Sequence, residues 1–91
     1  MQVKTKSGFK CEIKDGVLED WRFTRAVAKA HSDKDEERMI AAVDLVSLIL
    51  RENEDAYYDY VASKHDGLVT EDVVTADLQS IIEQVKALKN S

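Results

Sequence analysis

The sequence predicts an α+β fold that is mostly α-helical, in which an N-terminal β-hairpin packs on a bundle of about four helices. Two patterns support this prediction. Apolar and charged residues alternate in the first 14 residues, and from residue 17 onward the apolar residues recur at spacings of three and four. The chain has 91 residues and no proline, so we expect a single domain over residues 1–91 that lacks the commonest helix breaker.

Residues 1–14 carry the period of a two-stranded hairpin. Lysines and Glu12 occupy the positions expected to face water, and Gly8 can adopt the positive φ that a tight turn at Ser7-Gly8 requires. The inward positions on both sides of that turn are Val3, Thr5, Phe9, Cys11 and Ile13. A two-stranded hairpin alone is only marginally stable in water, so its apolar face must pack on the helices that follow.

The turn signal Asp15-Gly16 ends the alternation, and helical spacing begins directly after it. We predict a first helix over residues 17–31, with Glu19 and Asp20 in its first turn, where the helix dipole favours negative charge. Its apolar residues are Val17, Leu18, Trp21, Phe23, Val27 and Ala28.

A second helix is predicted over residues 34–51, with Ser32 or Asp33 as its N-cap. Apolar residues cover so much of its surface that we expect this helix to be buried at the centre of the fold. They are Met39, Ile40, Ala42, Val43, Leu45, Val46, Ile49 and Leu50.

Two more helices complete the predicted bundle, over residues 54–65 and 70–89. Asp66-Gly67 separates them as a helix stop, and Thr70 is expected to cap the last helix. The last helix carries an apolar row in which spacings of three and four residues alternate: Val74, Leu78, Ile81, Val85 and Leu88.

The charge and hydropathy of the chain disfavour several classes of partner. The 13 basic and 18 acidic side chains give a net charge of −5, which disfavours a phosphate backbone, so we expect no nucleic-acid partner. The longest apolar runs have only a few residues, which predicts no membrane span. The start lacks the apolar stretch of a signal peptide and Cys11 is the only cysteine, so we expect a cytoplasmic protein.

The residues that most often carry chemistry are too dispersed to predict a catalytic or metal site. Cys11, His31 and His65 lie in three different predicted elements, without the ligand spacing that zinc requires. Cys11 falls on the inner face of the hairpin, where it is expected to act as a small hydrophobic residue and not as a nucleophile. The three glycines are too scattered for a phosphate-binding loop. We therefore expect no enzyme, no metal and no cofactor.

Tyr58 and the last helix are the best candidates for a protein-binding surface. Tyr57 and Tyr60 are expected to face the core, which leaves Tyr58 more exposed. The apolar row of the last helix either completes the core of this domain or meets another chain, and a second row that includes Ile82 favours both uses. The predicted binding residues are Tyr58, Val74, Leu78, Ile81, Ile82 and Val85.

The N-terminal segment resembles the start of a known family. The stretch KTKSGFKCEI, followed after a short acidic turn by LEDWRF, is similar to the N-terminus of tail assembly chaperones from phages and prophages of Gram-positive bacteria. The shared features are a Lys/Thr-rich start before Ser-Gly-Phe, a strand that ends at Glu12-Ile13, and an acidic pair before Trp21. The similarity is most specific from Val3 to Phe23, whereas the first helix is more basic than in that family.

The resemblance implies a non-catalytic protein that binds the tape-measure protein, and other tail proteins, in the bacterial host cytoplasm while a siphophage tail is assembled. Such a chaperone is absent from the finished virion, and the family supplies no catalytic residue. Two alternatives stay open, namely a small structural or adaptor protein of a phage particle or mobile element, and a regulator that binds a host protein. The sequence also leaves open whether the chain forms a homo-oligomer.

Overall fold

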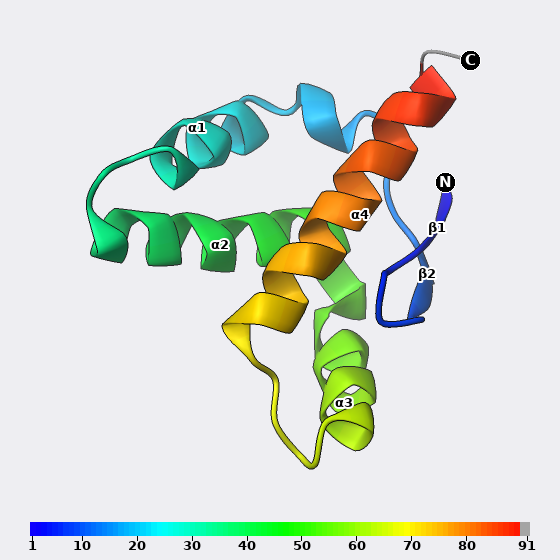
Figure 1. The fold of residues 1–91 in the computed structure, drawn as a ribbon. Helices are drawn as coiled ribbons and strands as arrows, with labels where there is room; N and C mark the ends of the chain where they lie inside the picture. Colours follow the sequence, from blue (N-terminus) through cyan, green and yellow to red (C-terminus); the bar gives the residue numbers. More distant parts are fainter. Residues whose placement is uncertain (90–91) are drawn as a thin grey trace.

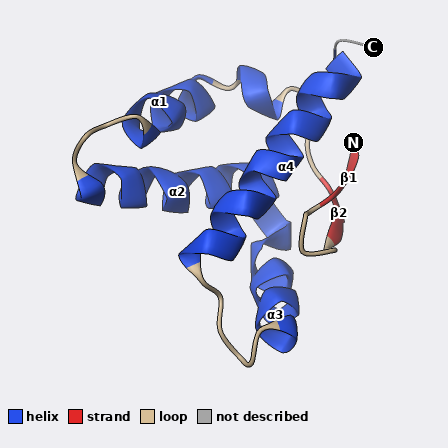
Figure 2. Cartoon of the chain, viewed as in Figure 1, coloured by secondary structure: helices blue, strands red, loops and turns tan. Residues whose placement is uncertain are grey.

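The computed structural model describes residues 1–89 and confirms a mostly helical α+β fold with an N-terminal antiparallel hairpin (Figures 1 and 2). Each strand has three residues, so the hairpin expected over residues 1–14 consists mostly of turn and connecting segments. In chain order the elements are β1 (Gln2–Lys4), β2 (Lys10–Glu12), the 3-10 turn η1 (Val17–Glu19), α1 (Trp21–Ala30), α2 (Asp35–Leu50), the 3-10 turn η2 (Arg51–Asn53), α3 (Glu54–Lys64) and α4 (Glu71–Lys89).

The helices are arranged around α2, which contacts α1, α3 and α4. After a short turn α1 is followed by α2, which runs back alongside it, whereas α4 crosses α2 obliquely (Figure 1). The chain bends at η2, and α3 points away from the α1–α2 pair (Figure 1). The hairpin lies beside α4, which contacts β1 (Figure 1). The two ends of the described chain therefore share one side of the molecule.

The hairpin has the inward and outward faces that its alternation predicts. Val3 pairs with Cys11, and both side chains are buried. The backbone N–H of Thr5 donates to the carbonyl of Phe9 at 2.8 Å, and the N–H of Gly8 donates to the carbonyl of Thr5 at 3.0 Å, which closes a three-residue turn. Gly8 has a φ of 106°, in the left-handed region that glycine adopts without strain. The glycine therefore makes this turn possible.

The starts of α1 and α2 both differ from the sequence prediction. The helix expected over residues 17–31 is broken at Asp20, whose extended backbone (φ −66°, ψ 129°) separates η1 from α1. Asp20 caps α1 and does not lie in its first turn, because its Oδ1 accepts the backbone N–H of Arg22 at 2.8 Å. At the start of α2 the N-cap position is Lys34, and the Oγ of Ser32 accepts the N–H of Lys34 at 3.1 Å. The prediction of Ser32 or Asp33 as the N-cap was therefore wrong.

Only part of α2 is buried, which corrects the expectation of a helix enclosed at the centre of the fold. Near its N-terminal end, Met39, Ile40 and Val43 are 58%, 51% and 59% exposed. A chain of this length has too few elements to cover the whole circumference of a 16-residue helix. The buried residues of α2 are Ala41, Leu45, Val46, Ile49 and Leu50.

One hydrophobic core joins the hairpin to the helices. Full burial of a side chain of the size of valine, leucine or phenylalanine stabilises a fold by about 1.5–3 kcal/mol, so the core supplies most of the stabilisation that a lone hairpin lacks. Its buried members are Val3, Cys11, Ile13, Val17, Phe23, Ala26, Leu45, Val46, Ile49, Leu50, Tyr57, Val61, Leu78, Ile81 and Val85.

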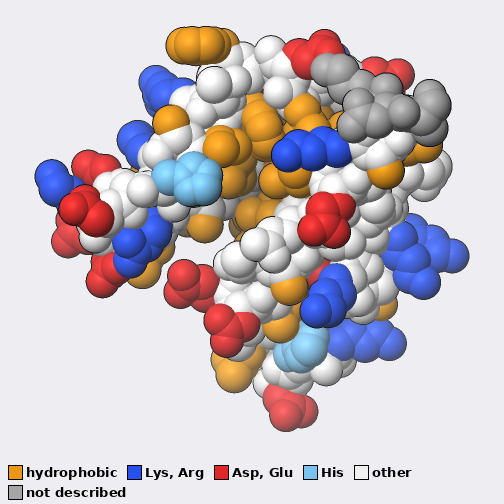
Figure 3. Space-filling view, turned by 45° about the horizontal axis from the view of Figure 1, so that its top comes forward, with side chains coloured by type: hydrophobic (Ala, Val, Ile, Leu, Met, Phe, Trp, Pro, Cys, Tyr) orange, Lys and Arg blue, Asp and Glu red, His pale blue; other side chains and the backbone are white. Residues whose placement is uncertain are grey.

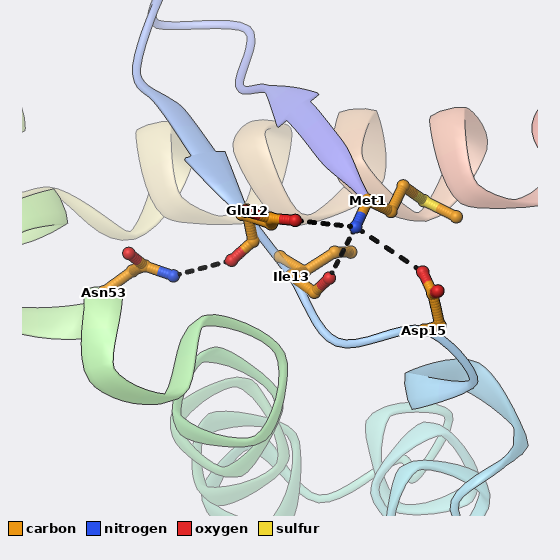
Figure 4. A network of polar contacts seen from close by, with 5 residues as sticks. All are labelled: Met1, Glu12, Ile13, Asp15 and Asn53. Atoms are coloured by element: carbon orange, nitrogen blue, oxygen red, sulfur yellow. Dashed lines mark hydrogen bonds and ion pairs between the residues drawn. The ribbon is translucent and has the colours of Figure 1, made fainter.

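Polar contacts hold the open end of the hairpin in place (Figure 4). The amino group of Met1 donates to the carbonyl of Ile13 at 3.0 Å and lies 3.6 Å from the carboxylate of Glu12 and 3.5 Å from that of Asp15. The side-chain amide of Asn53, in η2, donates to the carbonyl of Glu12 at 2.9 Å. The hairpin is thus attached to the helices by hydrogen bonds as well as by its apolar face.

Candidate functional site

An apolar groove lies between the exposed part of α2, the side of α3 and the beginning of α4. Its volume is about 250 Å³. Of the lining residues, Glu71 is the one with a charged side chain. The lining residues, which define the apolar groove, are Met39, Ala42, Val43, Val46, Tyr58, Val69, Thr70, Glu71, Val74 and Thr75.

Several hydrophobic side chains that line the apolar groove remain in contact with water. Met39 and Val43 come from α2, and Val69, which is 37% exposed, comes from the segment before α4. Leu68 precedes Val69 and is 63% exposed. Scattered exposed apolar residues are ordinary, but a concave cluster of them is the usual form of a protein-binding surface. The arrangement suits an apolar side chain of another polypeptide.

Tyr58 forms one side of the apolar groove and is held in a fixed position. Its hydroxyl donates to the Oε2 of Glu54 at 2.6 Å, and its ring lies 5.8 Å from that of Tyr57 between centroids. Burial, with the hydrogen bond to Glu54, raises the pKa of Tyr58 to about 12. The side chain therefore presents a neutral aromatic surface to the groove at neutral pH.

The structure divides the six predicted binding residues into two groups. Tyr58 and Val74 line the apolar groove. Leu78, Ile81 and Val85 are buried in the core, so in this structure they present no surface to a partner. Ile82 is half-buried and packs against the same core. The reason is geometric, since α4 lies across α2 and beside β1 and its apolar row is used there.

Sequence reasoning missed Met39, Val43 and Val69 as members of the site. The signal is the very wide apolar surface of residues 34–51, which taken alone predicts complete burial. A wide surface on a helix in so short a chain is equally consistent with one face in the core and one face free for a partner.

A second apolar hollow is visible on another side of the molecule. Figure 3 shows hydrophobic side chains that gather in the space between the α1–α2 pair and α4. Half-buried hydrophobic residues from the neighbouring elements pack against the core, among them Leu18, Val27 and Ile82. The domain therefore has more apolar surface than its own core uses.

The other candidate groups do not assemble into a chemical site. Burial raises the pKa of the Cys11 thiol, which disfavours the thiolate that nucleophilic chemistry needs. Within residues 1–89, no three His, Cys, Asp or Glu side chains are grouped closely enough to hold a metal ion. Over the same residues, no helix combines the length and the apolar character required to cross a bilayer. Comparisons with protein families, with curated proteins and with solved structures found no match.

Proposed function

We propose that this protein is a non-catalytic tail assembly chaperone that binds the tape-measure protein in the cytoplasm of the bacterial host and is absent from the finished virion. The observation that carries the proposal is the apolar groove, in which Met39 and Val43 remain exposed although the chain has a complete core elsewhere. The resemblance of the segment from Val3 to Phe23 to the phage chaperones supports the tape-measure protein as the client.

The groove is suited to the apolar face of an amphipathic helix. Helix-in-groove recognition inserts side chains at spacings of three and four residues into a hydrophobic channel. Each leucine-sized side chain that is buried in this way contributes about 1.5–3 kcal/mol. A tape-measure protein that exposes long hydrophobic helices before assembly would offer many such side chains.

The charge of the chain suits the same role. A net charge of −5 on a small domain repels other copies of the complex and opposes aggregation of a covered hydrophobic client. Glu71 at the edge of the apolar groove favours a client helix whose polar side is basic.

The proposal is tested by co-expression with the tape-measure protein of the same phage or prophage. We expect soluble co-purification of the two proteins. Val43→Asp places a carboxylate in the apolar groove at a position that is exposed in the free protein, and should reduce the co-purified client by about tenfold or more. The matched control is Leu88→Asp, also at an exposed apolar position (55%), which lies on α4 outside the apolar groove and should leave binding unchanged.

Two results would overturn the proposal. If the tape-measure protein stays insoluble and never co-purifies, the chain is not its chaperone. If the chain is found by mass spectrometry in purified virions in amounts comparable to the tail proteins, it is a structural or adaptor protein of the particle. Unchanged binding of the client by Val43→Asp would place the client on a surface other than the apolar groove.

A further inference from the structure

A basic cleft of about 590 Å³ lies between α1 and α2, on a protein whose net charge is −5. Four basic side chains line it, namely Arg22, Arg25, Lys29 and Arg51. Two carboxylates, Asp44 and Glu52, line it as well. The cleft therefore holds four of the 13 basic residues but only two of the 18 acidic residues, and is locally positive against an acidic remainder.

The basic residues of α1 reach the cleft because of their helical spacing. Arg22, Arg25 and Lys29 recur at intervals of three and four and so lie on one face of the helix. The guanidinium of Arg22 already forms an ion pair, since its Nη2 lies 2.7 Å from the Oδ2 of Asp20. Among the described residues, the charged side chains of Arg25 and Lys29 have no hydrogen-bond or ion-pair partner, so their charges are available to a ligand.

Arg51 is held at the cleft by a strained backbone. It follows the last residue of α2 with a φ of 53° and a ψ of −122°, a conformation that costs a residue with a side chain and that glycine adopts readily. Its backbone N–H donates to the carbonyl of Ser47, another residue of the cleft. Strain of this kind is concentrated at ligand sites, where the side chain is needed in spite of the backbone.

Trp21 adds a large apolar surface beside these charges. It is 77% exposed, it precedes Arg22, and it lies one helical turn from Arg25. Tryptophan and arginine are the residues most enriched at the energetic centres of protein interfaces. Asp44 and Glu52 weaken the attraction of the cleft for any anion, phosphate and carboxylate alike, but their oxygens can accept hydrogen bonds from the N–H groups of a peptide, which inorganic phosphate lacks.

We propose that the basic cleft, together with Trp21, is a docking site for an acidic segment of a partner polypeptide, separate from the apolar groove. Arg25 and Lys29 pair with the carboxylates of that segment, and Trp21 covers its apolar side chains. Arg51, whose Nε lies 3.9 Å from the Oε2 of Glu52, exchanges that exposed contact for a third carboxylate. The proposal does not depend on the identity of the client of the apolar groove.

Trp21 is the only tryptophan of the chain and lies one helical turn from Arg25 of the cleft, so its fluorescence is a signal from the proposed docking site. The test is a fluorescence titration of the full chain with a helical Ala/Glu peptide about 15 residues long, at low and at high salt. We expect a saturable change that weakens with salt. No saturable change with the Ala/Glu peptide would overturn the proposal, as would equal binding of an Ala/Lys peptide, of inorganic phosphate or of poly-uridine RNA.

Two charge-reversal double variants test whether the Ala/Glu peptide binds at the basic cleft. Arg25→Glu with Lys29→Glu should lower the affinity by about tenfold or more, whereas Lys10→Glu with Lys86→Glu, which makes the same change in net charge at exposed positions outside the cleft, should change it by less than about twofold. Equal effects of the two double variants would refute the site. Circular dichroism checks that both are folded, and Arg25→Gln with Lys29→Gln replaces the first pair if it is not.

Arg51→Gly separates a binding role from a structural one. Relief of the strained backbone should raise the urea concentration at the midpoint of unfolding, while loss of the guanidinium should weaken binding of the Ala/Glu peptide by about threefold or more. If the variant is more stable and binds the peptide as tightly as the original chain, Arg51 is not part of the binding site.

Discussion

The hydroxyl of Tyr57 donates a hydrogen bond of 2.7 Å to the Oδ2 of Asp77, which joins α3 to α4 in the interior. The same carboxylate accepts the backbone N–H of Ser7 at 2.8 Å and the hydroxyl of Ser7 at 2.7 Å. Asp77 is only 2% exposed, and these three donors are uncharged. A buried carboxylate is tolerated only when its lone pairs are satisfied. The turn of the hairpin is therefore fixed to both helices through one side chain.

Asp77→Asn should destabilise the fold by about 1–3 kcal/mol, because an amide nitrogen replaces an oxygen that accepts hydrogen bonds in the interior. The free energy of unfolding in urea measures this change. The control is Glu83→Gln, an exposed acid on the same helix, which should shift the free energy by less than about 0.5 kcal/mol. Equal stability of Asp77→Asn and the original chain would show that the buried network contributes nothing.

Gly8→Ala should destabilise the fold more than Gly67→Ala. Both glycines have positive φ, 106° and 83°, so alanine pays a similar backbone cost of about 1–2 kcal/mol at either position. At Gly8 the new Cβ would also lie 2.6 Å from the hydroxyl of Tyr60, whereas at Gly67 it would meet nothing within 4 Å. Urea unfolding of the two variants isolates the effect of that contact, and equal losses would contradict it.

The hairpin and the order of the helices could be predicted because local patterns determine them. The alternation of apolar and charged residues predicts that Val3 and Cys11 are buried, and the spacing of apolar residues predicts the helices. The break at Asp20 was missed because an acidic residue near a helix start fits either the first turn or the N-cap position. Only the backbone conformation distinguishes these two positions.

The sites could not be predicted equally well, because they depend on which helix faces meet. Asp77 lies three residues after Val74 and four before Ile81, on the apolar side of α4, and this position was a signal of a buried polar contact that sequence reasoning did not use. Its partner Ser7 is 70 residues away in the chain, and no local pattern connects the two. The choice between core and free surface on α2 likewise depends on how α4 crosses it.

The stability of the protein should fall as the pH rises from 10 toward 12. The pKa of Tyr58 is raised from 10.0 to about 12, with burial as the main cause, and burial also raises the pKa of Tyr57. Below pH 10 both tyrosines are neutral in the folded and the unfolded state. Between the two pKa values only the unfolded state loses a proton, so unfolding becomes more favourable. Urea unfolding across this range checks the sign.

The variant Tyr58→Phe should lose part of this alkaline sensitivity and keep the part that belongs to Tyr57. Titration of the folded protein by tyrosinate absorbance gives a second measurement, in which the ionisation of Tyr58 should fall near pH 12. A folded protein whose tyrosines all ionise at their ordinary pKa would show that neither ring is protected from water.

Two adjacent residues of α4 differ in burial, so their substitution by alanine should lower the free energy of unfolding by different amounts. Ile81 is 1% exposed and packs within the core, whereas Ile82 is half-buried at its edge. Ile81→Ala should therefore cost about 2–5 kcal/mol of unfolding free energy, because it removes buried methyl groups and leaves a cavity. Ile82→Ala removes the same atoms where water can fill the space, and should cost about 1 kcal/mol. Urea unfolding gives both values, and a larger loss for Ile82→Ala would reverse the assignment of the two faces of α4.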